Sequence, residues 1–456
     1  MKRSFFGVQA PRCMTIRFLL FLLAQAVSEF GSAASAAGLA TLWATQGAPA
    51  TELALVLAIP ALPALVLAPV IGSLMEGARL KRALIFINVL LGLTSLGAAG
   101  AFLLPQREAV LALTGLFVLK ALCQSAFNGA YNRAFRLLAP GGGVEGRAVS
   151  LQTLSNRLGT AVGAGLGAII ALKAGSAVFI VDAATFGVAT LVVAALPLGM
   201  GAPARSPGGP RLAPLALLRD VAVAVRYVMG SPRLMRVFAL YAPMTLVWAA
   251  WDILGAYLLR QAGAPEAFGT VVIAAQVGEI AVATGLAAIN ARFTVALVLA
   301  ATLLLALATG LSGLVVTGHT VLGVAGTLAL LVALRLVTGA TSNISGGGVY
   351  ALLVYSAPAG LTSRLTALVE SLGIGAMFAL AKLGVGILGD AIGPSQTFMV
   401  AGILAGALGF GLSLLEFQAR SRETAVLRLR MEVYQGLRSG GMDVAAFRYL
   451  IAQTTH

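Results

Sequence analysis

Charged residues are scarce in this chain. Of 456 residues only 10% are Asp, Glu, Lys or Arg, whereas 59% are apolar and the mean hydropathy is +0.95. Soluble globular domains carry about one-quarter charged residues. The low charge therefore excludes a water-soluble globular protein and predicts an integral membrane protein.

Cysteine and histidine are almost missing too. The chain has Cys13 and Cys123 as its two cysteines and His319 and His456 as its two histidines. A disulfide framework, a histidine-based metal site or a catalytic triad cannot be built from so few residues. The P-loop pattern of ATP-driven proteins is also absent. We therefore expect no enzyme activity and no cofactor, and we expect an ion gradient, with protons first, as the energy source.

The net charge of +15 is the feature that would suggest nucleic-acid binding. The basic residues, however, are spread among short loops and the chain ends, which is typical of membrane topology. We expect the lipid bilayer and a small-molecule substrate as partners, no nucleic acid, and a monomer.

Apolar stretches recur along the chain, and about 20 such residues are enough to cross a bilayer. The sequence predicts twelve transmembrane helices, at 16–43, 51–75, 83–104, 109–137, 148–173, 177–199, 236–261, 266–289, 295–317, 320–355, 365–390 and 395–417. The predicted fold class is therefore an all-α integral membrane protein.

Basic residues precede the first span, at Lys2, Arg3, Arg12 and Arg17. The positive-inside bias places this end in the cytoplasm, and an even number of spans returns the other end to the same side. We expect a multi-pass protein of the cell's inner (plasma) membrane with both termini cytoplasmic. The predicted organisation is a cytoplasmic N-terminus at 1–15, a six-helix bundle at 16–199, a cytoplasmic linker with an amphipathic helix at 200–235, a second six-helix bundle at 236–417 and a basic cytoplasmic tail at 418–456, either solvated or bound to the membrane surface.

The two halves echo each other in sequence. Three pairs of landmarks are separated by nearly the same length of chain: Gly72 to Arg79 with Gly285 to Arg292, Lys120 with Arg335, and Arg147 with Arg364. Internal repeats of this kind are how many transporters are built around a central site. The spacing indicates a duplication, and thus two pseudo-symmetric bundles.

Three segments carry a resemblance to a known family. The run from Ile59 to Gly72, with the charged residues that follow it, resembles helix two and the cytoplasmic signature loop of the major facilitator superfamily. The stretches Ala177 to Phe186 and Gly386 to Pro394 resemble, more narrowly, the branch of macrolide-efflux proteins and enterobactin-type siderophore exporters. The resemblance covers nearly all of residues 16–417, and it implies two six-helix bundles that rock around a central cavity.

The resemblance also implies a cytoplasmic gate in which the signature loop latches the halves together. Glu76 stands where the family usually has Asp, and Gly77 stands where it has a basic residue. Glu76 keeps the negative charge and can accept bonds from an Arg at a helix end. The alternative is that the basic residues serve only as topology signals. The predicted gate residues are Gly72, Glu76, Arg79, Lys81, Arg82, Gly285, Arg292 and Arg364.

Several charges fall inside predicted spans, where one charge costs about 2.5–3.5 kcal/mol on insertion scales. Such residues must face one another or a water-filled cavity. The candidates for proton coupling or the substrate cavity are Glu29, Lys120, Glu279, Arg335, Glu370 and Lys382, with Arg157 as a borderline addition. Asp182 and Asp252 lie nearer the outer ends of their spans, and we expect them to be structural.

Glu29 is the first candidate for the proton-coupled carboxylate, because it lies near the middle of a helix that lines the cavity in this superfamily. Lys120 and Arg335 are the matching cations, so that a proton and a cation could compete for one carboxylate. The alternatives are a purely structural ion pair at Glu29 and permanent neutralisation of Arg335 by Glu279 or Glu370.

The sequence thus predicts a secondary transporter that works by alternating access. The leading hypothesis is proton-coupled efflux of a small amphiphilic molecule such as a drug, a macrolide or a siderophore. The alternatives are a carrier of lysophospholipid or another lipid, and a non-transporting membrane receptor or scaffold.

Overall fold

The computed structural model describes residues 16–63, 67, 79–138, 145–196, 223, 225–288, 293–354 and 375–438. These residues form helices joined by short connections, and the described part of the chain contains no strand. The helices of the first half are α1 (Ile16–Gln46), α2 (Ala50–Ala58), α4 (Leu80–Ala101), α5 (Gln106–Leu138), α6 (Glu145–Ala174) and α7 (Ala177–Ala195). Those of the second half are α9 (Pro232–Ala239), α10 (Tyr241–Gln261), the 3-10 turn η1 (Pro265–Ala267), α11 (Phe268–Ala288), α12 (Val295–Thr317), α13 (His319–Val354), α15 (Met377–Ile392) and α16 (Pro394–Arg438).

Each predicted span corresponds to a helix of the structure. Among the described residues, ten helices are long and apolar enough to cross a membrane. The second and eleventh predicted spans are described only in part, as α2 and as α15, because 68–78 and 355–374 lie outside the described residues. The chain is thus a multi-pass membrane protein.

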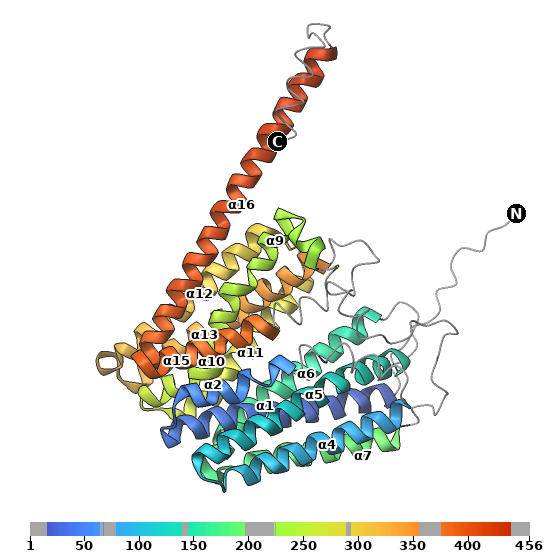
Figure 1. Ribbon diagram of the computed structural model, residues 1–456, viewed down its shortest axis with the longest axis vertical. Coiled ribbons are helices and arrows are strands. Elements are labelled where there is room, and N and C mark those ends of the chain that lie inside the picture. Colours follow the sequence, from blue (N-terminus) through green and yellow to red (C-terminus); the bar gives the residue numbers. More distant parts are fainter. Residues whose placement is uncertain are drawn as a thin grey trace, which may run out of the picture.

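The helices form two bundles that follow the order of the chain (Figure 1). In the first bundle α1 packs against α6 and α7, and α4 packs against α5 and α7. In the second, α12 packs against α13 and α16, and α10 against α15 and α16. The bundles touch through two pairs of helices, α6 with α11 and α2 with α15, and through α1 with α10. In Figure 1 they lie close together at the left and diverge toward the upper right.

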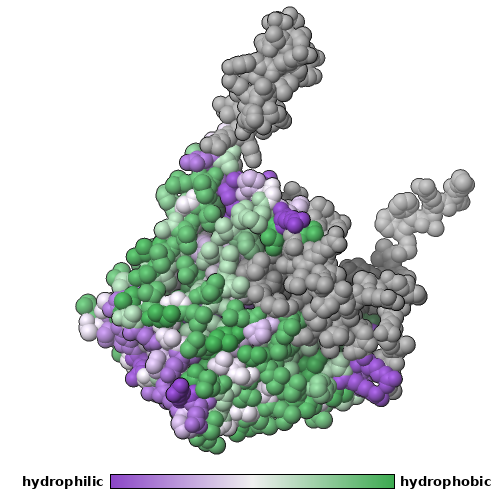
Figure 2. Space-filling model, viewed as in Figure 1, coloured by the Kyte–Doolittle hydropathy of each residue, from purple (hydrophilic) through white to green (hydrophobic). Residues whose placement is uncertain are grey.

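The surface is apolar, and the mainly apolar interior also holds buried hydroxyl groups. Figure 2 shows a broad apolar surface, in green, over both bundles. Large side chains such as Phe86, Leu191 and Phe417 are exposed, whereas Thr309 and Ser345 are fully buried. Lipid tails are as apolar as these exposed side chains, so exposure to lipid costs them little. Hydroxyl groups would find no partner in lipid, and the buried ones form hydrogen bonds with backbone carbonyls and with one another. Thr309, for example, donates to the Leu305 carbonyl at 2.9 Å.

Glycines allow the closest helix contacts. Gly159, Gly163 and Gly167 of α6 are spaced one turn apart and face α1. A Cβ atom built at Gly163 would lie 2.2 Å from the Phe30 carbonyl oxygen, and one at Gly167 would lie 2.3 Å from that of Ala34. Close packing of α6 on α1 therefore requires glycine at these positions. Small residues allow helix backbones to approach in the same way in other membrane interfaces.

The last helix differs from the sequence prediction. We expected the final span to end near Phe417, but α16 continues without interruption to Arg438 and extends far beyond its bundle (Figure 1). The segment from Gln418 to Gln435 contains no proline or glycine and is rich in Arg, Leu, Ala and Glu, which favour helix. The change from apolar to basic composition marks the end of the membrane span and leaves the helix intact.

Some sequence predictions lie outside the described residues. They are the N-terminus at 1–15, most of the linker at 200–235, the end of the tail, and five of the predicted site residues, namely Gly72, Glu76, Arg292, Arg364 and Glu370.

Candidate functional site

A cavity of about 530 Å³ lies between the bundles. Its wall comes mainly from α10 and α13 of the second bundle, with α11, α12 and α15 contributing, and α6 supplies Arg157 from the first bundle. The lining residues on which the site depends are Arg157, Trp248, Trp251, Asp252, Gln276, Glu279, Arg335, Thr338, Ser342, Asn343, Tyr350 and Phe378. The cavity therefore combines charged groups with aromatic side chains.

Arg335 projects from α13 onto α10. Its guanidinium carbon lies 4.4 Å from the ring centroid of Trp251, and its Nη1 donates to the Thr338 hydroxyl at 3.3 Å. Trp251 is fixed from behind by the edge of Phe398, with ring centroids 4.8 Å apart. A guanidinium held over an aromatic face gains a cation–π interaction. The aromatic pair thus positions a cation in the cavity wall.

Glu279 of α11 is paired across the bundle interface. Its Oε2 lies 2.6 Å from Nη1 of Arg157 on α6, and Gln276 accepts a bond from the same Nη1 at 3.5 Å. The sequence left open that Glu279 neutralises Arg335. The structure gives Glu279 a closer partner in the other bundle, so this ion pair links the two halves at the cavity.

Asp252 and Lys382 also pair at the cavity. Lys382 Nζ of α15 lies 3.1 Å from Oδ2 of Asp252 on α10, and it sits 4.1 Å from the centroid of the Phe378 ring. Asp252 was expected to be structural. It forms an ion pair, but its side chain is half exposed and lines the cavity, so its role stays a prediction.

Glu29 lies on α1, outside the set of residues that line the cavity. Gln25, one turn earlier, donates to its carboxylate at 2.8 Å. Arg157 interacts electrostatically with both Glu29 and Glu279. One cation of α6 is therefore shared between a carboxylate of each bundle.

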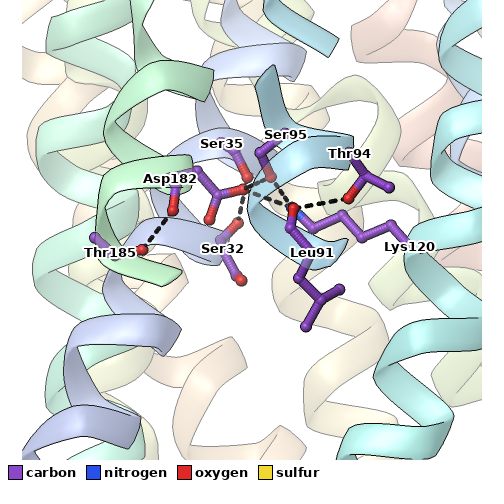
Figure 3. Close-up of polar contacts among 8 residues, drawn as sticks. All are labelled: Ser32, Ser35, Leu91, Thr94, Ser95, Lys120, Asp182 and Thr185. Atoms are coloured by element: carbon purple, nitrogen blue, oxygen red, sulfur yellow. Dashed lines mark hydrogen bonds and ion pairs between the residues drawn. The ribbon is translucent and has the colours of Figure 1, made fainter. Parts of the chain in front are cut away.

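Lys120 does not line this cavity; it lies within the first bundle, with its side chain 17% exposed. Its Nζ lies 2.5 Å from Oδ2 of Asp182 on α7, and Ser95 of α4 donates to the same oxygen at 2.8 Å (Figure 3). Asp182 is fully buried. Lys120, predicted as a cavity cation, is thus paired with Asp182 away from this cavity, and the structural role of Asp182 stays a prediction.

The gate residues are described in part. Lys81 donates to the carbonyl of Leu196 at 3.0 Å and so caps the end of α7, which is a favourable place for a cation. Arg79 precedes α4, Arg82 lies in its first turn, and a Cβ atom built at Gly285 would meet no atom of another described element within 4 Å. The latch itself remains a prediction, because its central residues lie outside the described part.

A second set of contacts joins the bundles at the end where they lie close together. Asp390, near the end of α15, accepts bonds from the backbone N–H groups of Ala50 and Thr51 at 2.7 and 2.8 Å. A carboxylate is favoured at a helix N-terminus such as that of α2. Tyr257 donates to the Ala48 carbonyl at 2.9 Å, and Arg260 donates to that of Ala44. We call this set the closed-end contacts.

Sequence reasoning missed these contacts and the aromatic wall of the cavity. Asp390 lies in the segment Gly386 to Pro394 that carries the family resemblance, but the resemblance assigned it no role. Trp248 and Trp251 are spaced so that they lie on one side of α10, with Asp252 next to them. A pair of tryptophans three residues apart beside an intramembrane charge was the available signal.

No family model matches the sequence, and no curated protein matches it either. Solved structures do. A variant of the nucleoside transporter NupG is 12% identical, with a TM-score of 0.71, over 87% of this chain and 99% of that one. The peptide transporter POT, in complex with sulfate, is 17% identical with a TM-score of 0.66, over 91% and 96% of the two chains.

The fold is that of the major facilitator superfamily. A POT family transporter in complex with 5-aminolevulinic acid has the same arrangement, with 12% identity and a TM-score of 0.65 over 88% of this chain and 96% of that one. The predicted all-α membrane class with this fold is thereby confirmed, and the described residues show ten of the twelve predicted spans as helices long enough to cross a membrane. At such low identity the similarity concerns the fold, and function must be argued from the site.

Proposed function

We propose that this chain is a secondary transporter that works by alternating access and exports a small amphiphilic molecule, such as a drug, a macrolide or a siderophore, in exchange for protons. The observation that carries the proposal is the cavity between the bundles, with charges of both halves in its wall and the closed-end contacts beyond it. Bundles that rock about such a site expose it to each side of the membrane in turn. The solved structures with this fold that are named as transporters support the transporter part of the proposal.

Arg157 offers a physical route for coupling. It is paired with Glu279 and interacts electrostatically with Glu29. Protonation of Glu29 removes one of the two negative charges that attract Arg157, and so strengthens the bond between the bundles through Glu279. Loss of that proton draws Arg157 back toward α1. In this way the protonation of Glu29 biases the relative position of the two bundles.

We place the protein in the cell's inner (plasma) membrane as a monomer with both termini in the cytoplasm, on the basis of the distribution of basic residues. The closed-end contacts then lie on the outer side, and the cavity is closed toward the outside. An ion gradient is the proposed energy source, without a cofactor.

Substrate-driven proton flux tests the proposal. The protein is reconstituted into liposomes that contain a pH-sensitive dye, and macrolides, siderophores and lipophilic cations are added in turn. We expect one of them to drive proton movement in the parent protein and none to do so in Glu29→Gln. Glu108→Gln is the matched control, because Glu108 is an exposed carboxylate in the first turn of α5.

Each other outcome contradicts a stated part of the proposal. Substrate flux without proton movement would reject coupling and favour a facilitator. Flux of labelled lysophospholipid alone would favour the lipid carrier. Absence of flux for every compound, in protein that is folded and correctly inserted, would favour the non-transporting receptor or scaffold.

A further inference from the structure

Arg335 lines the cavity, and part of its guanidinium has no hydrogen-bond partner. Thr338 occupies Nη1, and the buried Nε has no hydrogen-bond partner. Within the described part of the chain no carboxylate lies within 4.0 Å of this side chain. The edge formed by Nε and Nη2 is the one that binds the two oxygens of a carboxylate in a bidentate manner. Arg335 is therefore built to receive an acceptor that the described protein does not supply.

The carboxylates around Arg335 are already neutralised by other cations. Glu279 is held by Arg157 at 2.6 Å, and Asp252 is held by Lys382 at 3.1 Å. Both also interact with Arg335 electrostatically, but from beyond ion-pair distance. Counted with Glu29, which shares Arg157, this group has three cations and three anions, and Arg335 is the cation that no described carboxylate approaches within ion-pair distance. A ligand carboxylate would make the direct contact with its guanidinium that neither Glu279 nor Asp252 makes.

A second donor beside Arg335 also lacks an acceptor. The indole Nε1 of Trp251 is buried and has no hydrogen-bond partner, whereas that of Trp248 donates to Ser342 at 2.7 Å. Buried donors in native structures are nearly always satisfied. Both orphaned groups, Arg335 Nε and Trp251 Nε1, can only donate. Their common requirement is an oxygen acceptor.

The rest of the wall suits an aromatic or other flat apolar body. Aromatic residues make up 7% of the chain, yet Trp248, Trp251, Tyr350 and Phe378 all line this one cavity. Trp248 and Phe378 meet edge to face, with ring centroids 6.2 Å apart, which leaves an angular apolar surface. Aromatic side chains gain from edge and stacking contacts with rings of a ligand.

We propose that Arg335 is the specificity-determining residue of the cavity and that the transported molecule is an organic anion, with a carboxylate-type group on Arg335 and an aromatic body against Trp248 and its neighbours. This inference rests on the proposed transport function and narrows its substrate class. It disfavours macrolides and lipophilic cations among the candidates, because a cationic amine would repel Arg335.

Three ligands with the same ring and different charge test the inference on the unaltered protein. The probes are 1-naphthylacetate, its neutral amide 1-naphthylacetamide, and the cation 1-naphthylmethylammonium. Binding to the full chain in nanodiscs is measured by titration calorimetry, with empty nanodiscs subtracted. A hydrogen bond to a charged group contributes about 1.5–3 kcal/mol, so we expect the carboxylate to bind about 10- to 100-fold more tightly than the amide. The cation should bind no better than the amide.

Variants then assign the preference to Arg335. Arg335→Gln should reduce the affinity for the carboxylate to that for the amide. Arg335→Lys should keep part of the preference for the carboxylate, because lysine keeps the positive charge but cannot form the bidentate pair of bonds. Arg107→Gln, which removes an exposed arginine in the first turn of α5, should leave the affinity for all three ligands unchanged. Equal binding of carboxylate and amide, tighter binding of the cation, or an unchanged preference in a folded Arg335→Gln protein would overturn the inference. The ligand series still decides the charge preference if Arg335→Gln does not fold.

Flux of the same probes separates this inference from the proposed function. Gradient-driven transport of neutral and cationic compounds without preference for the anion would leave the transporter intact and reject the assignment of Arg335. Binding of the anion at Arg335, with no flux of any compound, would keep the site and reject transport.

Discussion

Lys120 and Arg335 occupy corresponding places in the two halves, but the structure puts them to different use. Lys120 lies within the first bundle, where it pairs with Asp182, which is 0% exposed, and contacts the rings of Phe117 and Phe186. Arg335 faces the cavity, rests on Trp251 and has no carboxylate within ion-pair distance among the described residues. The comparison teaches that an intramembrane cation with an internal partner supports the fold, whereas one without a partner is available to a ligand.

The largest effect is expected at Lys120. Lys120→Met leaves the buried Asp182 carboxylate without its cation, and breaking a buried ion pair costs about 3–5 kcal/mol. We expect a large fall in the melting temperature of the purified protein. The double variant Lys120→Met with Asp182→Leu should recover most of it, since no unpaired charge remains.

Arg335→Gln is the matched change in the other half. It should lower the free energy of unfolding by less than about 1 kcal/mol, because no described carboxylate loses its ion-pair partner. If it destabilises the protein as much as Lys120→Met does, the two cations have the same role and the comparison fails.

A glycine substitution in each half should come next in size. A Cβ at Gly167 would lie 2.3 Å from the Ala34 carbonyl oxygen, and one at Gly339, one turn after Arg335, would lie 2.0 Å from that of Ala275. Overpacking of this kind costs about 1–3 kcal/mol. We expect both alanine variants to lower the melting temperature, but only Gly339→Ala to weaken binding of 1-naphthylacetate, because it displaces the helix that carries Arg335.

Gly187→Ala is the control, since a Cβ at Gly187 meets no atom within 4 Å. It should be neutral or slightly stabilising, as alanine favours helix by about 0.5–1 kcal/mol. Equal effects of Gly167→Ala and Gly339→Ala on ligand affinity would show that the first bundle also shapes the site.

The pair between the bundles should give a smaller, conformational effect. The Arg157 side chain is 41% exposed, so loss of its bond to Glu279 is expected to cost about 1 kcal/mol or less. Glu279→Gln should shift the balance between the two orientations of the bundles by up to about fivefold, with little change in melting temperature. Distances between spin labels on α5 and α12 would report it.

Arg157→Gln combined with Glu279→Gln should shift the distribution no further than Glu279→Gln alone, because the same bond is already lost. A distribution in Glu279→Gln that matches the parent would mean that this pair does not hold the bundles together.

The smallest effect is expected at the closed-end contacts. Asp390→Asn keeps the hydrogen-bond acceptor but removes the negative charge from the N-terminus of α2, where it contributes about 0.3–1 kcal/mol. A cysteine introduced near this end should react slightly faster with a membrane-impermeant reagent. Glu108→Gln should leave the rate unchanged, and an unchanged rate in Asp390→Asn would show that the other contacts close this end without it.

The intramembrane charges show how far the sequence could predict the site. Their positions within apolar spans identified Lys120, Asp182, Asp252, Glu279, Arg335 and Lys382, all of which the structure gives a close partner or a place in the cavity wall. Which cation meets which carboxylate could not be predicted, because the pairs join residues 62 to 130 positions apart on different helices. The same holds for Asp390, whose partners lie 340 and 339 residues away.

The sequence by itself determined that the chain is a helical membrane protein of two related halves, because span length, the scarcity of charge and the repeated landmarks are local properties of the chain. Tertiary structure alone decided that Lys120 pairs with Asp182 while Arg335 has no ion-pair partner among the described residues, that Arg157 bridges the halves, and that α2 is capped by α15. The physical reason is that a charge in a bilayer must find a partner, whereas the identity of that partner depends on how the helices pack.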